Sequence, residues 1–490
     1  MLCEKKRDFK EHPIISVENL VPLDNFYRNV EATLDLSFVR DLVRTHYSGT
    51  MGRPSIDPVV FFKLHLIMFF EGIRSERQLM ETVHLNLAHR WYIGYDLDEP
   101  VPDHSSLSKI RDRYGVEVFQ QFFETIVEYC IQAGLVWGQE LYFDGTRIQA
   151  NADVDSLQPR LELVTQHLEA LFPQQPMTEL QPEPMQPASP ASLPRRLMDK
   201  YYGARMTTRR THWYKRKSDK LVSPTDPDAS PMKQGSDNIA KLGYHTHYAV
   251  DGGKARVILA ALVTPASIMD NTPMLDLTCW VRFRWHLLPT IAVGDAKYGT
   301  TPNIAGLEQD GLHGYMPTPD FSQRRGVYPT TAFRYDAVYD RYLCPKDVEL
   351  PLCSRRQSEW MLVYRAEATT CNACPVKSEC TDSQSGRHIF RSFFQEYLDR
   401  AASYRETEAY KKALRKRQVW VEPLFGEAKR WHQGRRFRLR GLEKVNIEGL
   451  LKASGQNIKR LLKARRGSKQ TSPAGGVILQ MPSFLSVFLD

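Results

Sequence analysis

The stretch LYFDGTRI, residues 141–148, places one acidic side chain directly after a short run of strand-forming residues. Leu141, Tyr142 and Phe143 favour a buried strand, and Gly145 gives the backbone freedom to turn close to whatever Asp144 faces. Because Asp-Gly is also the commonest turn pair of a β-hairpin, this stretch alone supports either a ligand or an ordinary turn. The choice depends on whether other acids can meet Asp144 in the fold.

Two further acids have a comparable setting. Asp295 ends the apolar run LPTIAVGD, residues 288–295, and Glu422 lies in a basic segment with helical character. The elements expected between and after Asp144 and Asp295 are a hairpin of strands at 242–251 and 255–264, a helix at 270–282, a helix after Thr300 and a last strand at 313–318. This is the element order of an RNase H-like mixed sheet flanked by helices, an α+β or α/β arrangement. Three separated carboxylates could then meet on one sheet.

Length, composition and charge limit the function. The chain has 490 residues, of which 42% are hydrophobic and 11% aromatic, enough for two to four domains with well-formed cores. Lys and Arg number 66 against 57 Asp and Glu, and the net charge of +9 favours a polyanionic partner. No apolar run is long enough for a membrane helix, and the start MLCEKKRD lacks the apolar core of a signal peptide. We therefore expect a soluble, cytoplasmic protein without a membrane partner.

The region before Asp144 predicts several short helices. Asp57 and Pro58 suit the start of an apolar helix at 59–71, and Ser75 suits the start of another. A third begins near Pro102 with Lys109, Arg111 and Arg113 expected on its exposed side. This pattern fits a helix-turn-helix-like DNA-binding domain, and equally a helical bundle with a solvated charged face.

Two segments after Asp144 have unusual composition or histidine spacing. Residues 171–194 are rich in Pro, Gln, Met and Glu and predict a segment without a core, and residues 195–220 mix cations with Tyr and Trp. Such a mixture suits DNA backbones and unpaired bases, or a solvated helix face. His245 and His247 share a strand face and could bind a metal, although histidines hydrogen-bonded within the sheet are the favoured interpretation.

A group of cysteines precedes the Glu422 segment. Cys371 and Cys374 have the spacing of thiolate metal ligands, with Cys380 close by and Cys344 upstream. We assign these four to a zinc site and leave Cys353 spare; an iron–sulfur cluster accepts the same ligands. Four protein ligands leave no position for water, so the site is expected to be structural.

Five motifs together resemble those of DDE transposases from bacterial insertion sequences. They are FDGTRIQANA (143–152), TDPDA (225–229), LGYHTHYAVD (242–251), VGDAKYGT (293–300) and VEPLFGEAK (421–429). The helical region 52–114 is similar to the N-terminal domain of the same proteins, so the resemblance covers most of residues 50–465. In that family the third acid and a lysine lie two helical turns apart, as Glu422 and Lys429 do here. One departure is that the arginine one turn before the glutamate is Gln418 here, with Arg417 beside it.

The resemblance implies that Asp144, Asp295 and Glu422 are catalytic and hold two Mg²⁺ (or Mn²⁺) ions. Asp144 would bridge both ions, Asp295 would hold one and Glu422 the other. Two ions about 3.5–4 Å apart serve both the attacking and the leaving oxygen of a phosphodiester. Carboxylates are the ligands that Mg²⁺ prefers. The residues expected to contact DNA are Lys429, Arg435, Arg436, Arg438, Arg440, Lys109 and Arg111.

The expected function is cleavage at the terminal inverted repeats of an insertion sequence and strand transfer to target DNA. By analogy the protein acts in the nucleoid as a homodimer or larger assembly, without a small-molecule substrate, and a hairpin intermediate is allowed. The alternatives are an RNase H-like nuclease that cuts without joining and an inactive DNA-binding protein. The expected divisions are a lead-in (1–50), a helical DNA-binding domain (51–135), a first core part (136–325) with a disordered, basic insertion at about 165–235, a cysteine-rich insertion (326–395), a second core part (396–465) and a tail (466–490).

Overall fold

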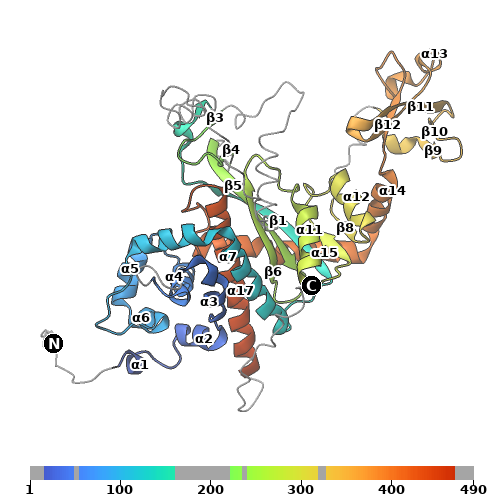
Figure 1. The fold of residues 1–490 in the computed structure, drawn as a ribbon. Coiled ribbons are helices and arrows are strands. Elements are labelled where there is room, and N and C mark those ends of the chain that lie inside the picture. The colour runs from blue at the N-terminus through green and yellow to red at the C-terminus, as the bar shows by residue number, and fades with distance from the viewer. Residues whose placement is uncertain (1–15, 49–54, 160–220, 234–239, 318–326, 470–490) are drawn as a thin grey trace, which may run out of the picture. The chain divides into compact units, whose positions relative to one another are not determined.

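The computed structural model describes residues 16–48, 55–159, 221–233, 240–317 and 327–469 (Figure 1). The chain divides into two compact units: the helical unit, residues 1–135 and 451–490, and the sheet unit, residues 136–450. The basic and aromatic residues 195–220, and with them most of the expected insertion, lie outside the described residues. Within the residues that are described, no helix is both long enough and apolar enough to cross a bilayer.

The helical unit consists of short helices that begin at polar caps. Its helices are α1 (Val17–Leu20), α2 (Phe26–Thr33), α3 (Phe38–Val43), α4 (Pro58–Phe70), α5 (Glu76–Leu85), α6 (Leu87–Ile93), α7 (His104–Gln132) and the second part of α17 (Leu442–Lys469). Asp57, Ser75 and Asp103 accept backbone N–H groups at the starts of α4, α5 and α7, which confirms the helix starts expected there.

Aromatic residues fill the core of this unit. Phe62 of α4 stacks on Phe122 of α7 with ring centroids 4.3 Å apart. Gly455 lets α17 approach closely, because a Cβ atom there would lie 2.4 Å from Phe69. The kink of α7 falls at Gly115, whose φ is 65°.

The expectation that Arg111 lies on an exposed face is wrong. The side chain of Arg111 is only 3% exposed, and its Nη1 lies 2.8 Å from Glu76 Oε1 on α5. The arginine therefore links α7 to α5, and only Lys109 and Arg113 of the three expected cations are exposed.

The sheet unit contains a mixed sheet centred on β1 (Glu140–Gln149). β5 (Ala240–Asp251) pairs antiparallel with one edge of β1, and β7 (Ile291–Val293) pairs parallel with the other. β8 (His313–Tyr315) extends the sheet beyond β7, and β6 (Ile258–Pro265) and β4 (Ser230–Lys233) pair with different parts of β5. The expected order of strand, hairpin, helix, strand, helix, strand is present.

The Asp-Gly pair does not form the turn that this stretch by itself allowed: β1 continues to Gln149, and Gly145 pairs with His247 of β5. One expectation about this sheet is wrong. Residues 221–233, which fell within the expected insertion, form β3 (Leu221–Val222) and β4, and β4 belongs to the sheet. Pairing with β5 stabilises both Gly145 and β4 within the sheet, although the local sequence favours a turn or a coil there.

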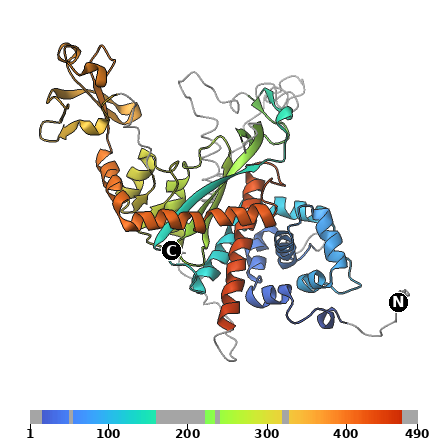
Figure 2. The ribbon, with the colours of Figure 1, turned by 180° about the vertical axis from the view of Figure 1, so that it is seen from behind.

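Helices cover both faces of the sheet (Figures 1 and 2). α11 (Met274–Trp285) contacts β5 and β6, and α12 (Thr301–Gln309) follows β7. α15 (Glu408–Trp420) contacts β7 and β8 on the opposite face and leads into α16 (Glu422–Trp431). These last two helices carry side chains that contact β1 on that face.

The TDPDA motif caps the start of α17. Asp228 Oδ2 accepts the N–H of Leu442 at 2.7 Å, and Asp226 Oδ1 accepts the N–H of Gly441 at 3.1 Å. Asp226 also accepts the hydroxyl of Tyr244 at 2.5 Å. Two carboxylates thus stabilise the positive end of the helix, and both lie about 200 residues before it in the chain.

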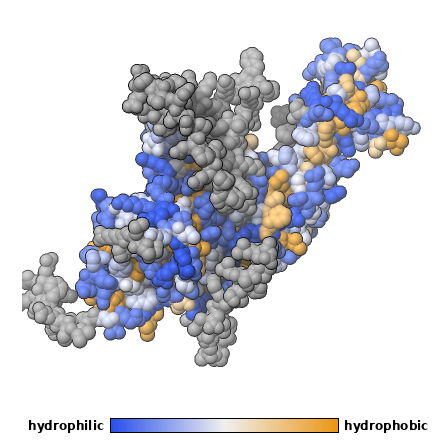
Figure 3. All heavy atoms as spheres, in the orientation of Figure 1, coloured by the Kyte–Doolittle hydropathy of each residue, from blue (hydrophilic) through white to orange (hydrophobic). Residues whose placement is uncertain are grey.

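The cysteine-containing segment forms a second, antiparallel sheet in the order β13-β12-β11-β10-β9. Its strands are β9 (Arg334–Asp336), β10 (Arg341–Leu343), β11 (Glu349–Arg356), β12 (Met361–Arg365) and β13 (His388–Ser392). Phe333, Leu350, Tyr364 and Ile389 are buried in its small core. Figure 3 shows hydrophobic residues among hydrophilic ones on the surface of this part.

Candidate active site

One face of β1 carries the first acid toward α15 and α16. Side chains two residues apart on a strand share a face, and those of β1 that meet these helices are Glu140, Tyr142, Asp144 and Thr146. Asp144 lies 3.7 Å from the guanidinium of Arg417 on α15. At the end of this row, Lys429 of α16 donates to the hydroxyl of Thr146 at 2.6 Å. The alternation of side chains along β1 therefore directs Asp144 toward α15, which carries Arg417, and α16, which carries Glu422 and Lys429.

Asp295 lies beside Asp144 through the strand register. β7 runs parallel to β1 with its last residue, Val293, opposite Tyr142; Asp144 lies two residues further along β1, and Asp295 lies two residues beyond the end of β7. Asp295 Oδ1 accepts the backbone N–H of Lys297 at 2.8 Å, which fixes the turn after β7. Asp295 therefore follows the carboxyl end of β7, beside the middle of the longer strand β1 that carries Asp144.

Glu422 completes the group of acids at the start of α16. Burial raises the pKa of Asp144 to about 6, Arg417 acts to lower it, and the charges of Asp295 and Glu422 act to raise it. Asp144 therefore lies close enough to both Asp295 and Glu422 for their charges to act on it. The structure brings together the residues that the sequence singled out, although it does not test their catalytic role.

A cation of the chain itself lies between two of these acids. Arg417 Nη2 is 3.1 Å from Glu422 Oε1, and its Nη1 faces Asp144. Among the described residues, no three His, Cys, Asp or Glu side chains are arranged so that together they could hold a metal ion. The carboxylate oxygens nevertheless have the chemistry that Mg²⁺ prefers, and Arg417 demonstrates that a positive charge is stable between them.

The opposite face of β1 has a second polar group, which the sequence did not indicate. Asp270, in the loop before α11, lies 2.9 Å from His245 Nδ1 and 3.2 Å from Lys297 Nζ. Burial acts to raise the pKa of Asp270, but the hydrogen bond and charge of His245 hold it well below its usual range. Asp270 fell at the expected start of a helix, and only the folded sheet brings it to His245.

Gly145 is where this second group approaches β1. A Cβ atom at Gly145 would lie 3.3 Å from His247 Nδ1 and 3.4 Å from the hydroxyl of Tyr298. Burial lowers the pKa of His247 to about 3, and its Nε2 lies 2.8 Å from the hydroxyl of Thr264. His245 and His247 are therefore engaged with protein groups, as the favoured interpretation of their spacing expected.

The buried Tyr298 lies between the two polar groups. Burial raises the pKa of Tyr298 well above its usual value, and Asp144, Asp270 and Asp295 raise it further. Tyr298 belongs to the VGDAKYGT motif, but its position three residues after Asp295 did not reveal that it would be buried beside Asp144.

The arginine-rich segment after α16 runs along the end of β1. Gln149 donates its N–H to Arg435 O at 3.1 Å, and Arg436 Nε donates to Ala150 O at 3.1 Å. Arg440 Nε donates to Asn151 O at 2.9 Å, and Arg438 N donates to Glu448 Oε2 at 2.9 Å.

The side chains of Arg436 and Arg440 thus have local partners, whereas that of Arg435 is exposed near Lys429. The pKa of Lys429 is lowered by burial and by Arg435, and raised by Asp144. Positive charge therefore gathers next to the three acids.

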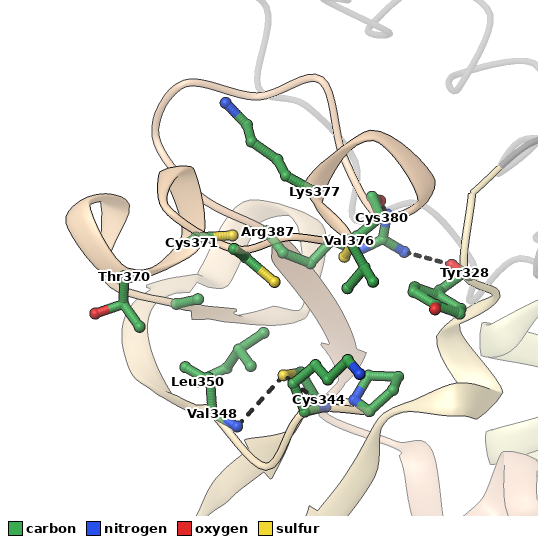
Figure 4. A pocket seen from close by; sticks show the side chains of 14 residues that line it. Tyr328, Cys344, Val348, Leu350, Thr370, Cys371, Val376, Lys377, Cys380 and Arg387 are labelled. Carbon is green, nitrogen blue, oxygen red and sulfur yellow. Dashed lines mark hydrogen bonds between the residues drawn. The ribbon is translucent and has the colours of Figure 1, made fainter.

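Four cysteines line one pocket of the second sheet (Figure 4): Cys344, Cys371, Cys374 and Cys380. Burial raises the pKa of Cys380, Arg387 lowers it, and the other three cysteines raise it. The sulfur of Cys344 accepts the N–H groups of Lys346 and Val348, each at 3.3 Å. These backbone donors would stabilise a thiolate at Cys344, but the four cysteines, like the other described residues, do not form a group arranged to hold a metal ion. Cys353 is exposed and does not line the pocket.

Comparison with known families matches two parts of the chain to transposase domains. Residues 15–113 match the family "Transposase domain (DUF772)", which covers most of the helical unit. Residues 343–462 match the family "Transposase DDE domain", a range that includes Glu422, Lys429, the arginine-rich segment and the four cysteines. Two separate parts of the chain thus match models of transposase domains, which supports a DDE-type transposase of the insertion-sequence kind.

A solved structure gives a weaker similarity. The cryo-EM structure of a piggyBac transposase synaptic complex with hairpin DNA is similar over 91% of this chain and 77% of that chain, at 10% identity and a TM-score of 0.35. A similarity at this level carries no argument about the site. Comparison with curated proteins found no match.

Proposed function

We propose that the protein is a metal-dependent DNA transposase with an RNase H-like core. The observation that carries the proposal is the placement of the three acids: Asp144 lies on β1, Asp295 follows the end of the neighbouring strand β7 at the aligned position, and Glu422 begins α16. The order β6-β5-β1-β7-β8, with only β5 antiparallel to β1 among its direct neighbours, is the order expected of an RNase H-like sheet.

The proposed site residues are the three carboxylates, which would hold Mg²⁺ or Mn²⁺. Two such ions supply a nucleophile at neutral pH and stabilise the attacking and leaving oxygens of a phosphodiester. Asp144 is the buried member and accepts the N–H of Gly145 at 2.9 Å, which orients its carboxylate. Glu422 is about half exposed, so it lies on the side from which DNA would enter.

The proposed reaction has two displacements at phosphorus. In the first, water attacks at the end of the element, the P–O3′ bond breaks and a 3′ hydroxyl is released. In the second, that hydroxyl attacks a target phosphodiester, a new P–O bond forms and the target's 3′ oxygen leaves with a proton. Lys429, held against β1 by Thr146, and the exposed Arg435 would bind phosphates next to the acids.

The proposed partner is DNA, both the terminal inverted repeats and the target, and self-association is proposed by analogy alone. Lys109 and Arg113 remain exposed cations of the helical unit, whereas Arg111 is not a candidate because it is buried against Glu76. We also propose that the four cysteines hold a structural zinc ion. The position of all four cysteines around one pocket and the N–H donors to Cys344 support this second proposal.

The test uses a duplex that carries the inverted repeat flanking the reading frame. Asp295→Asn keeps the shape of the side chain but removes a ligand charge, so strand cleavage in Mg²⁺ should fall by at least about 10³-fold. Asp310→Asn is the control, because Asp310 is an exposed acid that pairs with Arg282 in the same unit. Unchanged cleavage by Asp295→Asn would remove the mechanism, and cutting without joining by the unaltered protein would favour the nuclease.

A further inference from the structure

Arg417 has an unusual position for an arginine of a surface helix. It lies near the end of α15, its side chain is only 13% exposed, and its guanidinium contacts Asp144 and Glu422 at 3.7 and 3.1 Å. These acids come from different elements, a central strand and the start of α16. One cation of the chain thus connects two of the three carboxylates of the proposed metal site.

The neighbouring residues fix α15 in this position. Lys416 Nζ lies 2.6 Å from Glu140 Oε2 and within 5.1–5.2 Å of the ring centroids of Trp137, Tyr142 and Trp420. Trp420 in turn donates its indole N–H to Gly253 O at 2.9 Å. Contacts on both sides of Arg417 therefore hold the helix against β1, and the guanidinium reaches the acids without a change in the backbone.

The position of Arg417 between two carboxylates affects how a metal ion could bind them. Carboxylates gathered at a partly buried site repel one another, and a nearby positive charge offsets that repulsion. A divalent cation on the oxygens of Asp144 and Glu422 would use the same lone pairs and would repel the guanidinium. Arg417 in its observed position and a metal ion on these two acids are therefore competitors.

We infer that Arg417 is the resident cation of the site: it holds Asp144 and Glu422 together before metal enters, and a divalent ion must displace it to bind. This inference rests on the proposed function, because it takes the three acids as the metal site. It assigns a role to a residue next to Gln418, the position at which the sequence departs from the family pattern. The device delays full metal loading until the ion concentration is high enough to replace the arginine.

The test measures metal binding without DNA and without catalysis. Full-length wild type, Arg417→Gln and the control Arg415→Gln, an exposed arginine on the same helix, are titrated with MgCl2 while the melting temperature is followed. Without metal, Arg417→Gln should melt below the wild type, because its carboxylates lack their cation. Its half-saturating Mg²⁺ concentration should fall by about tenfold or more, because a charge-assisted hydrogen bond no longer competes. Arg415→Gln should match the wild type in both quantities.

Two further variants separate the possible failures. Asp295→Asn leaves the contacts of Arg417 in place and should abolish the change in melting temperature with Mg²⁺. If the melting temperature of the wild type does not respond to Mg²⁺ either, the proposed metal site is wrong, and so is the inference that rests on it. If Asp295→Asn behaves as expected but Arg417→Gln needs as much Mg²⁺ as the wild type, or more, the inference alone is overturned. Arg417→Lys keeps a competing charge and should need more Mg²⁺ than Arg417→Gln; equal requirements would also overturn it, even where Arg417→Gln folds poorly.

Discussion

Replacing Lys416 with methionine should destabilise the sheet unit more than neutralising any exposed charged residue of α15 would. Lys416 pairs with Glu140 at 2.6 Å, and both side chains are about one-fifth exposed, at 19% and 18%. Methionine keeps most of the volume and the apolar stem, so the change removes the charge and leaves little cavity. The variant therefore isolates the ionic and cation–π contacts that hold α15 against β1.

The size of the effect follows from the surroundings of the pair. Exposed ion pairs contribute about 0.2–1 kcal/mol, whereas breaking a fully buried pair costs about 3–5 kcal/mol. The partial exposure of Lys416 and Glu140 lies between these cases, and the three nearby rings each add a favourable contact to the cation. We expect Lys416→Met to lower the free energy of unfolding by about 1–3 kcal/mol.

A double-mutant cycle in urea measures the contribution. Glu140→Gln and Lys416→Met should together cost less than the sum of the two, with a coupling of about 1–2 kcal/mol. The control cycle pairs Lys411→Met with Glu408→Gln, because these exposed residues of the same helix lie 3.7 Å apart. Their coupling should stay below about 0.5 kcal/mol. A coupling of Lys416 with Glu140 no larger than that of the control would refute the reasoning.

Three other predictions concern pH, metal content and DNA affinity. Because burial lowers the pKa of His247 to about 3, below the value of about 6.5 in an unfolded chain, the folded state should lose up to a few kcal/mol as pH falls from 7 toward 4. His247→Gln should weaken that pH dependence in urea unfolding; an unaltered pH dependence would contradict the burial argument. Purified protein should contain about one zinc ion per chain by elemental analysis. Cys374→Ser should lose this zinc, and the control Cys353→Ser should keep it. Absence of both zinc and iron from the unaltered protein would reject the site. Arg435→Gln should reduce the slope of log affinity against log salt for duplex DNA by about one unit without changing the midpoint of urea unfolding. Arg436→Gln should also lower that midpoint, because Arg436 Nε donates to Ala150 O in the folded protein. Equal effects of the two arginines on stability would argue against this distinction.

Local patterns predicted the helix starts and the order of the sheet. Helices were expected to begin at Asp57, at Ser75 and near Pro102, and Asp57, Ser75 and Asp103 accept backbone N–H groups there. Such caps act within one helical turn, so a few residues of sequence are enough to predict them. The hairpin of β5 and β6 was predicted for the same reason, since alternating apolar residues around a glycine-rich turn are a local signal.

The errors arose where distant residues override a local preference. Asp-Gly at 144–145 also suits a turn, but pairing with β5 keeps it within a ten-residue strand. Arg111 suits an exposed helix face, but Glu76 of another helix gives it a buried partner. In both places, contacts that form only in the folded chain decide the outcome.

By itself, the sequence determined which acids to consider, because Asp144, Asp295 and Glu422 lie in motifs that resemble those of one family. Only the tertiary structure decided their surroundings: Arg417 between two of them, Lys416 among aromatic rings, and Asp270 with Tyr298 behind β1. The physical reason is distance along the chain. Strand register brings Glu140 beside Ile291, 151 positions away, and helix packing brings it to Lys416, 276 positions away. No pattern of neighbouring residues encodes which charge will meet which carboxylate.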